Sequence, residues 1–128
     1  MSNQVLITRG SSALRFHLPG VEFICGASPS RGSQQLCCWT IEVAAKYDSP
    51  EPHTLDRDEV LTVNSGSIQL QPDGELLGPG DTAVVPSGTP IQLTNPGTSV
   101  ARVQVAIQAG FEATMADGTS RFTPPWAK

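Results

Sequence analysis

The sequence predicts an all-β domain, an antiparallel sandwich or barrel, and three observations lead to this prediction. The 128 residues suffice for one hydrophobic core but not for two. Glycine and proline are frequent, with 12 and 11 residues, which indicates many turns between short elements. No helical periodicity of apolar residues continues for more than about two turns, whereas short strand-like runs recur along the chain.

Each strand-like run is bounded by turn residues such as Pro-Gly, Ser-Gly or Asn-Pro-Gly. Residues 67–71 alternate polar and apolar side chains, as a half-buried strand does, and in 100–108 one face is formed by Ala101, Val103, Val105 and Ile107. The predicted strands cover residues 5–8, 14–18, 21–25, 36–45, 59–63, 67–71, 82–85, 91–94 and 100–108.

In two segments the pattern of apolar residues does not determine the local structure. In residues 36–45 either Trp39 and Ile41 or Thr40 and Glu42 face the core, and a shift by one residue exchanges the two sets. The segment 111–128 is too rich in proline for a central strand. We expect it to form a C-terminal arm that packs on the domain through Phe122 and Trp126.

The composition limits the classes of partner that we expect this protein to bind. The net charge of −4 argues against binding to nucleic acid or to an anionic membrane surface. No run of 18 apolar residues and no secretory signal occurs, so we expect neither a membrane span nor export. The three cysteines, an odd number, fit reduced thiols. We therefore predict a cytoplasmic protein with a small-molecule ligand.

Two spaced motifs lie in the middle of the chain. The first contains His53, Glu59 and Gly66, and the second contains Gly80, Pro86, Gly88 and Asn95. In residue type and spacing they resemble the two motifs of the cupin superfamily, in the segments 53–66 and 80–95. This resemblance implies that residues 1–128 form a single double-stranded β-helix, the jelly-roll cupin barrel.

The departures from the motifs bear on the chemistry. A metal-binding cupin usually uses three histidines and one glutamate, and here only His53 and Glu59 occupy such positions. Leu55 and Ile91 stand at the other two, and Tyr47 replaces the leading glycine. Leucine and isoleucine offer no lone pair, so a divalent ion would bind weakly. We therefore expect no cofactor. A metal held by His53, Glu59 and substitutes such as Asp56, Asp58 or a cysteine is the less favoured alternative.

An imidazole and a carboxylate in an apolar pocket suit proton transfer. We predict a metal-independent acid–base enzyme, an isomerase, cyclase or lyase (dehydratase), with His53 and Glu59 as catalytic residues. We expect the pocket to be lined by Leu55, Ile91, Tyr47, Val63 and Leu93.

Several alternatives stay open. One alternative is a non-catalytic small-molecule-binding cupin, which is a sensor or an accessory protein. Another is a metal-dependent oxygenase with unusual ligands. In a further alternative, His53 and Glu59 have no catalytic role and are hydrogen-bonded to each other at an exposed rim of the barrel. We also expect a homodimer, because small cupins commonly pair sheet to sheet and outward residues such as Val60 and Val100 need cover. The substrate, reaction and pathway are not indicated.

Overall fold

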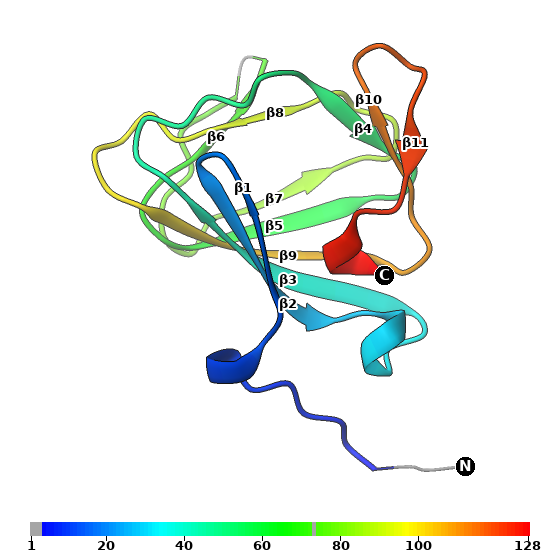
Figure 1. The fold of residues 1–128 in the computed structure, drawn as a ribbon. Coiled ribbons are helices and arrows are strands. Elements are labelled where there is room, and N and C mark those ends of the chain that lie inside the picture. Colours follow the sequence, from blue (N-terminus) through cyan, green and yellow to red (C-terminus); the bar gives the residue numbers. More distant parts are fainter. Residues whose placement is uncertain (1–3, 73) are drawn as a thin grey trace.

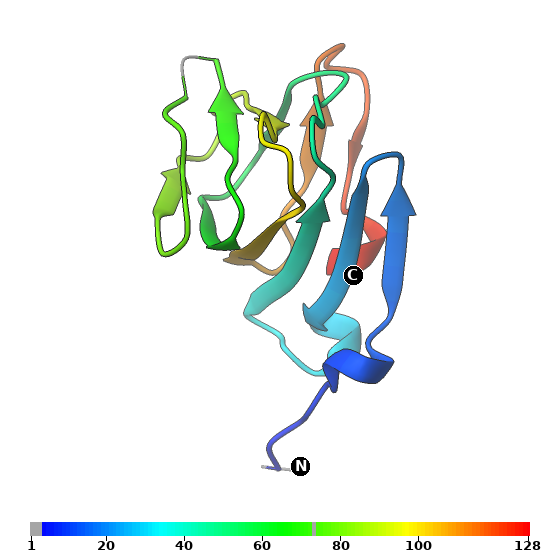
Figure 2. The same ribbon diagram turned by 90° about the vertical axis from the view of Figure 1, so that its left-hand side faces the viewer.

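The computed structural model describes residues 4–72 and 74–128, and it has the predicted jelly-roll architecture. One layer is a six-stranded antiparallel sheet in the order β1-β2-β3-β9-β5-β7. Opposite it lie a three-stranded sheet, β11-β10-β4, and a two-stranded sheet, β6-β8 (Figures 1 and 2). Among the described residues the sheets do not close into one continuous barrel.

The strands are short and are joined by turns and three-residue 3₁₀ helices. None of these helices, the only ones in the described ranges, is long enough to cross a membrane. The elements are η1 (Gly10–Ser12), β1 (Arg15–Leu18), β2 (Val21–Ala27), η2 (Pro29–Arg31), β3 (Leu36–Val43), β4 (His53–Leu55), β5 (Glu59–Ser65), β6 (Gln69–Gln71), β7 (Thr82–Val85), β8 (Gln92–Thr94), β9 (Ala101–Gln108), β10 (Ala113–Met115), β11 (Arg121–Phe122) and η3 (Pro125–Ala127).

The core lies between the layers, and strand alternation determines which side chains enter it. In β3 every second residue is buried, Trp39 and Ile41 among them, so Thr40 and Glu42 face outward. This settles the register that the sequence left open. The long strand β9 alternates in the same way, with Val103, Val105 and Ile107 buried.

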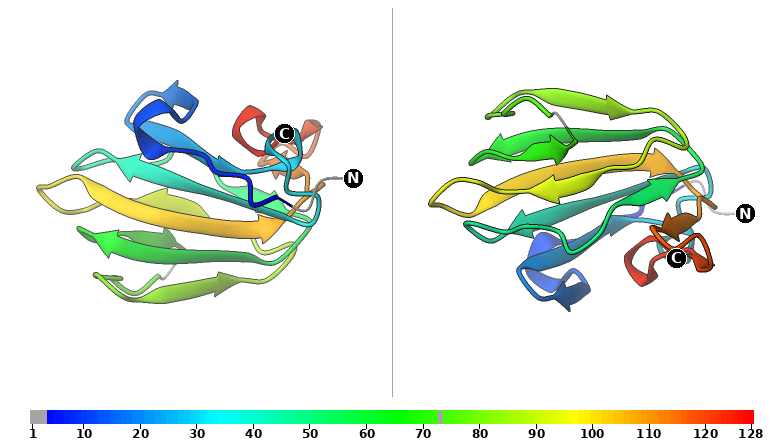
Figure 3. Two further views of the ribbon diagram at one scale, coloured as in Figure 1. Left: turned by 90° about the horizontal axis from the view of Figure 1, so that it is seen from below. Right: turned by 90° about the horizontal axis from the view of Figure 1, so that it is seen from above.

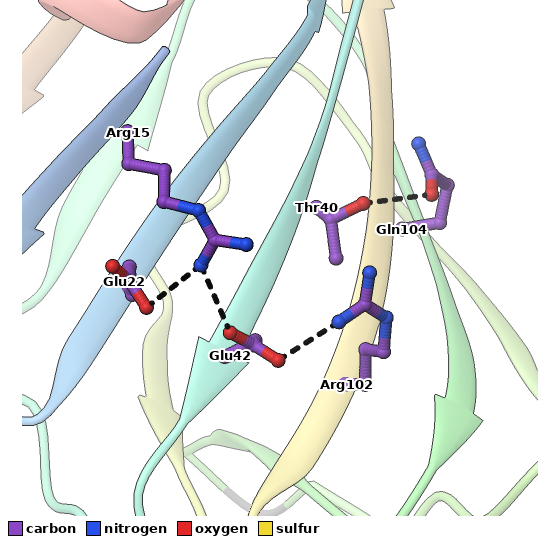
Figure 4. A network of polar contacts seen from close by, with 6 residues as sticks. All are labelled: Arg15, Glu22, Thr40, Glu42, Arg102 and Gln104. Carbon is purple, nitrogen blue, oxygen red and sulfur yellow. Dashed lines mark hydrogen bonds and ion pairs between the residues drawn. The ribbon is translucent and has the colours of Figure 1, made fainter. Parts of the chain in front are cut away.

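The outer face of the six-stranded sheet is polar along β1, β2, β3 and β9. Glu42 lies between two arginines, 3.6 Å from Arg15 and 2.8 Å from Arg102, and Arg15 also pairs with Glu22 at 3.2 Å (Figure 4). These side chains are well exposed, so each ion pair stabilises the fold by at most about 1 kcal/mol.

The C-terminal segment packs on the domain through one of its two expected anchors. The indole of Trp126 stacks on Phe23, with ring centroids 3.6 Å apart and planes 9° apart. Phe122 is 40% exposed, so its predicted packing role is wrong. The segment also contributes β10, which pairs with β4.

The strand predictions differ from the structure at two places. Residues 5–8 form no strand but belong to an extended segment that leaves the body before η1 (Figure 1). The strands β4, β10 and β11 were not predicted, because runs of two or three residues are too short to show a period of two.

Candidate active site

The motif glycines fix the turns around the site. Gly66 has φ of 74°, and a Cβ there would lie 2.7 Å from Ala101 Cα and 2.7 Å from the carbonyl oxygen of Val100. Gly88 has φ of 81°, the left-handed conformation expected for the turn after Pro86. The positions of Gly66 and Gly88 in the two motifs are therefore explained by backbone geometry.

Two polar side chains hold the loops that flank the site. Asn95 is fully buried; its Nδ2 donates to the carbonyls of Val43 (3.1 Å) and Ser99 (3.0 Å), and its Oδ1 accepts from the N–H of Gly97. Asp58 accepts a 2.9 Å hydrogen bond from the N–H of Ser87. The motif asparagine thus has a structural role, and Asp58 joins the first motif to the second.

His53 begins β4 and faces the interior, as does Leu55 two residues later. Its backbone exchanges two hydrogen bonds of 3.0 Å with Ile91, and on the other side it pairs with Met115 of β10. Burial lowers the pKa of the His53 imidazole, so this side chain is neutral at pH 7.

Glu59 begins β5 and also faces the interior, between Val85 of β7 and Ile107 of β9. It is 6% exposed, and burial raises the pKa of its carboxyl group from 4.5 to about 7. No hydrogen bond or ion pair between described residues reaches this carboxyl group, including from His53. The alternative in which His53 and Glu59 are hydrogen-bonded to each other at an exposed rim is therefore wrong.

An apolar groove lies at the strand neighbours of these two residues, although neither His53 nor Glu59 lines it. We call it the β7 groove; it measures about 420 Å³ and is lined by Leu70, Gln71, Pro72, Ala83, Val84, Val85, Pro86, Thr89, Pro90 and Ile91. This volume is within the range of small-molecule sites.

The strand pairing connects the groove to the candidate catalytic groups. Val85 is the direct cross-strand neighbour of Glu59, and Ile91 is that of His53. Directly opposed residues have Cβ atoms roughly 5 Å apart and share a face of the sheet. The two titratable groups therefore lie beside two residues of the groove wall, on the same face of the sheet as these residues.

The predicted pocket residues do not all meet at this groove. Ile91 lines it, while Leu55 and Val63 are buried in the core and Leu93 is half-buried against it. The ring of Tyr47 packs on Gly20, in the turn between β1 and β2. That Leu55, Val63, Leu93 and Tyr47 line a ligand pocket stays a prediction.

Sequence reasoning missed two features of this region. The first is Val85, which was not predicted to line a pocket. It ends the strand before Pro86, two residues after Ala83, so both side chains lie on the same face of the strand. The second is the indole N–H of Trp39, which is buried on the inner face and has no hydrogen-bond partner in the part of the chain described. A free donor of this kind suits a polar ligand atom or a water molecule.

The donor set does not fit a cupin metal cage. Leu55 and Ile91 offer no ligand atom, and the described residues contain no group of three histidine, cysteine or acidic side chains placed to hold an ion. The possible substitutes are engaged elsewhere: Asp56 accepts from a backbone N–H ahead of β10 at 2.7 Å, and Cys37 donates to a backbone carbonyl in η3.

Comparison with known proteins agrees with this fold. The family model described as the Cupin domain matches residues 39–108, more than half of the chain. The chain belongs to the cupin family. No curated protein matches the sequence of this cupin.

Solved structures resemble this cupin at low sequence identity. The polyketide cyclase RemF from Streptomyces resistomycificus has a TM-score of 0.70 and 19% identity, covering 84% of this chain and 80% of its own. A cupin-superfamily sugar phosphate isomerase from Silicibacter pomeroyi has a TM-score of 0.69 and 18% identity, covering 91% and 92%. The nucleoside dehydratase Pac13 from Streptomyces has a TM-score of 0.64 and 16% identity, covering 84% of each chain. At these identities the likeness establishes the fold.

Proposed function

We propose that this cupin is a metal-independent enzyme that moves protons on a small molecule that enters between the layers at the β7 groove, with Glu59 as general acid and His53 as general base. The observation that carries the proposal is the isolated, buried carboxyl group of Glu59 beside the groove wall. Burial raises the pKa of the acid and lowers that of the base, so near neutrality each is in the form that its role needs.

The chemistry that suits this pair is proton abstraction next to a carbonyl group. Neutral His53 takes a proton from the carbon, the C–H electron pair becomes the C=C bond of an enol, and protonated Glu59 gives its proton to the carbonyl oxygen. Return of a proton to another carbon completes an isomerisation, and loss of a β-hydroxyl group as water completes a dehydration. Both steps conserve charge and need no metal or oxidant.

The proposal predicts a pH window. Activity needs His53 neutral and Glu59 protonated, so it falls below the lowered pKa of His53 and above about pH 7, the pKa of Glu59. Replacing Glu59 by glutamine should remove the alkaline limb of this profile together with most of the rate.

Deuterium exchange tests the chemistry before the substrate is known. The protein is incubated in D₂O with hydroxyketones, sugar phosphates and aromatic β-ketones, and NMR follows loss of the C–H signal next to the carbonyl. We expect exchange with at least one class, reduced about 100-fold or more in His53→Gln and Glu59→Gln. His17→Gln and Glu42→Gln are matched controls, because both lie on outer-face positions, and they should retain the rate. Equal exchange in all four variants would exclude the assigned roles.

A non-catalytic binding protein is the second candidate, because most of the groove lining is apolar and, among the described residues, only Gln71 and Thr89 bring polar side chains to it. A ligand at about 100 times its Kd adds about 2.7 kcal/mol to the free energy of unfolding. A compound that gives such a shift, is recovered unchanged, and binds equally to wild type and Glu59→Gln favours this candidate.

A further inference from the structure

Two aromatic pairs lie side by side on the inner face of the six-stranded sheet. Trp126 stacks on Phe23, and Trp39 stacks on Phe111 with ring centroids 5.9 Å apart and planes 22° apart. Phe23 is opposite Ile41 in the β2–β3 ladder, one inner-face position from Trp39, so the Cβ atoms of Phe23 and Trp39 are about 7 Å apart. The four rings therefore form one group, which we call the aromatic cluster.

Both indole groups of this cluster have a buried N–H without a hydrogen-bond partner in the described part of the chain. Trp39 is 3% exposed, so its nitrogen atom is shielded from bulk water. A buried donor without a partner costs about 1–3 kcal/mol, and such donors are rare in native structures. The cluster therefore offers two hydrogen-bond donors to an acceptor from outside the chain.

The segment 123–128, which we call the C-terminal cover, lies over this cluster. Its helix η3 contacts β1, β2 and β3, on the opposite side of the molecule from β7 (Figure 3). No strand ladder between described residues includes the cover. Its first residue donates to the carbonyl of Phe111 at 2.8 Å, and the carbonyls of its last two residues accept from Cys37, Ser28 and Ser30. A segment held in this way can open while the sheets stay paired.

A row of inner-face residues leads from the cover to the candidate active site. Cys37, which contacts the cover, is opposite Ile107, and Ile107 is opposite Glu59. The Cα atoms of Cys37 and Glu59 are therefore two strand spacings, about 10 Å, apart. The next residue of the row is Val85, in the wall of the β7 groove. The aromatic cluster and the β7 groove thus lie on opposite flanks of Glu59.

The chemistry of this interior favours an uncharged ligand. The buried polar or charged residues among those described are Ser28, Glu59 and Asn95, so no buried lysine or arginine among them pairs with an anion. Burial raises the pKa of the Glu59 carboxyl group, and no nearby cation offsets this rise. A phosphate or carboxylate group between the layers would therefore lose its hydration without gaining a partner. Aromatic walls with N–H donors suit a planar ring that carries carbonyl oxygen.

We infer that the aromatic cluster is a subsite for the ring of an uncharged aromatic ketone, which stacks on Phe23 in place of the Trp126 indole and accepts a hydrogen bond from Trp39. The indole of Trp126 lies 3.6 Å from Phe23 with planes 9° apart, which is the geometry of a bound planar ring, and the cover moves outward when the ligand replaces it. That a second carbonyl group of the same molecule reaches His53 and Glu59 rests on the proposed function, whereas binding of the ring does not.

Three matched naphthalenes test the ligand class without any turnover. They are 2,6-diacetylnaphthalene, 2-acetyl-6-ethylnaphthalene and 6-acetyl-2-naphthoate, which differ only in the group at one end of the ring. Calorimetric titration of the full chain should give a Kd at least tenfold lower for the diketone than for the other two compounds. No binding of the diketone, equal affinity for the diketone and the ethyl compound, or tighter binding of the naphthoate would overturn the inference.

Two variants assign the contacts. Trp39→Phe keeps a stacked ring but removes the N–H, so it should weaken binding of the diketone about tenfold and leave binding of the ethyl compound nearly unchanged. Trp126→Ala removes the competing indole and should strengthen binding of the diketone at least tenfold. Phe122→Ala, at an exposed site just before the cover, is the matched control and should leave binding unchanged. A Trp126→Ala protein that binds the diketone no more tightly than wild type contradicts the replacement of the indole.

The indole N–H signals of the wild type give the same answer without depending on how a variant folds. The chain has two tryptophans, so ¹⁵N-labelled protein gives two indole cross-peaks, and Trp126→Phe assigns them. Saturating diketone should move the Trp39 proton downfield as its hydrogen bond forms, and should shift the Trp126 signal as its ring leaves Phe23. If neither signal moves, the subsite is wrong. If both move but wild type catalyses no deuterium exchange next to the carbonyl group, the subsite stands and the proposed acid–base roles fail.

Discussion

Replacing Glu59 by glutamine gives a direct test of the burial on which the candidate site depends. The folded carboxyl group has a pKa of about 7, whereas its unperturbed value is 4.5. Because the folded state binds the proton more tightly, the stability contributed by the protonated group is fully present below pH 4.5 and is lost as the pH rises through 7. The full difference corresponds to about 3 kcal/mol.

Urea denaturation of wild type and Glu59→Gln measures this contribution. The free energy of unfolding of the wild type should fall relative to that of the variant by about 3 kcal/mol between roughly pH 4 and pH 8.5. The comparison across pH removes any constant cost of the new amide group. Glu42→Gln, on the exposed outer face, is the matched control, because it removes a carboxylate whose exposed ion pair with Arg102 contributes at most about 1 kcal/mol.

One outcome would refute this reasoning. If the wild type gains stability relative to Glu59→Gln as the pH rises, the folded state favours the charged carboxylate. A bound cation is a physical cause of that sign, because it lowers the pKa of a carboxylate. Loss of the gain on addition of EDTA would then establish the unusual metal site, and the acid role of Glu59 would be abandoned.

Three further predictions concern the framework of the site. Gly66→Ala should lower the free energy of unfolding by about 2 kcal/mol or more in urea, because of its positive φ and the contact with Ala101, whereas Gly78→Ala, with open space around it, should change it little. Asn95→Ala should cost about 2–4 kcal/mol, measured as a fall in thermal midpoint, because it leaves buried backbone groups without partners. Asp58→Ala should cost about 1 kcal/mol by urea denaturation, because it removes one exposed hydrogen bond to Ser87.

The sequence predicted the long strands well because they carry the clearest alternation. The run 100–108 differs from β9 by one residue, and the run 59–63 begins with β5 at Glu59. Residues 36–45 were located but not oriented, since both of its faces carry side chains that suit a core, such as Trp39 on one and Thr40 on the other. The sheet on which β3 packs decides between them, and that is a tertiary property.

The site was less predictable than the fold. Motif spacing identified His53 and Glu59, but not their degree of burial, which depends on neighbours distant in sequence such as Ile107. The β7 groove is made by three segments that no local pattern joins: the end of β6, the strand β7, and residues 89–91. Tyr47 was placed near the pocket by its sequence proximity to His53, yet its ring packs at the turn between β1 and β2.

The two aliphatic replacements in the motifs have more than one effect. A metal cage needs Glu59 ionised, because a ligating carboxylate is deprotonated. Leu55 and Ile91 remove two ligand atoms and add apolar volume to the same interior. With fewer polar neighbours the charged form of Glu59 loses solvation, and its pKa rises into the range where it donates protons at neutral pH. The changes that weaken a cation site therefore also favour a proton donor, so the absence of the two ligands and the proposed acid–base chemistry have one physical cause.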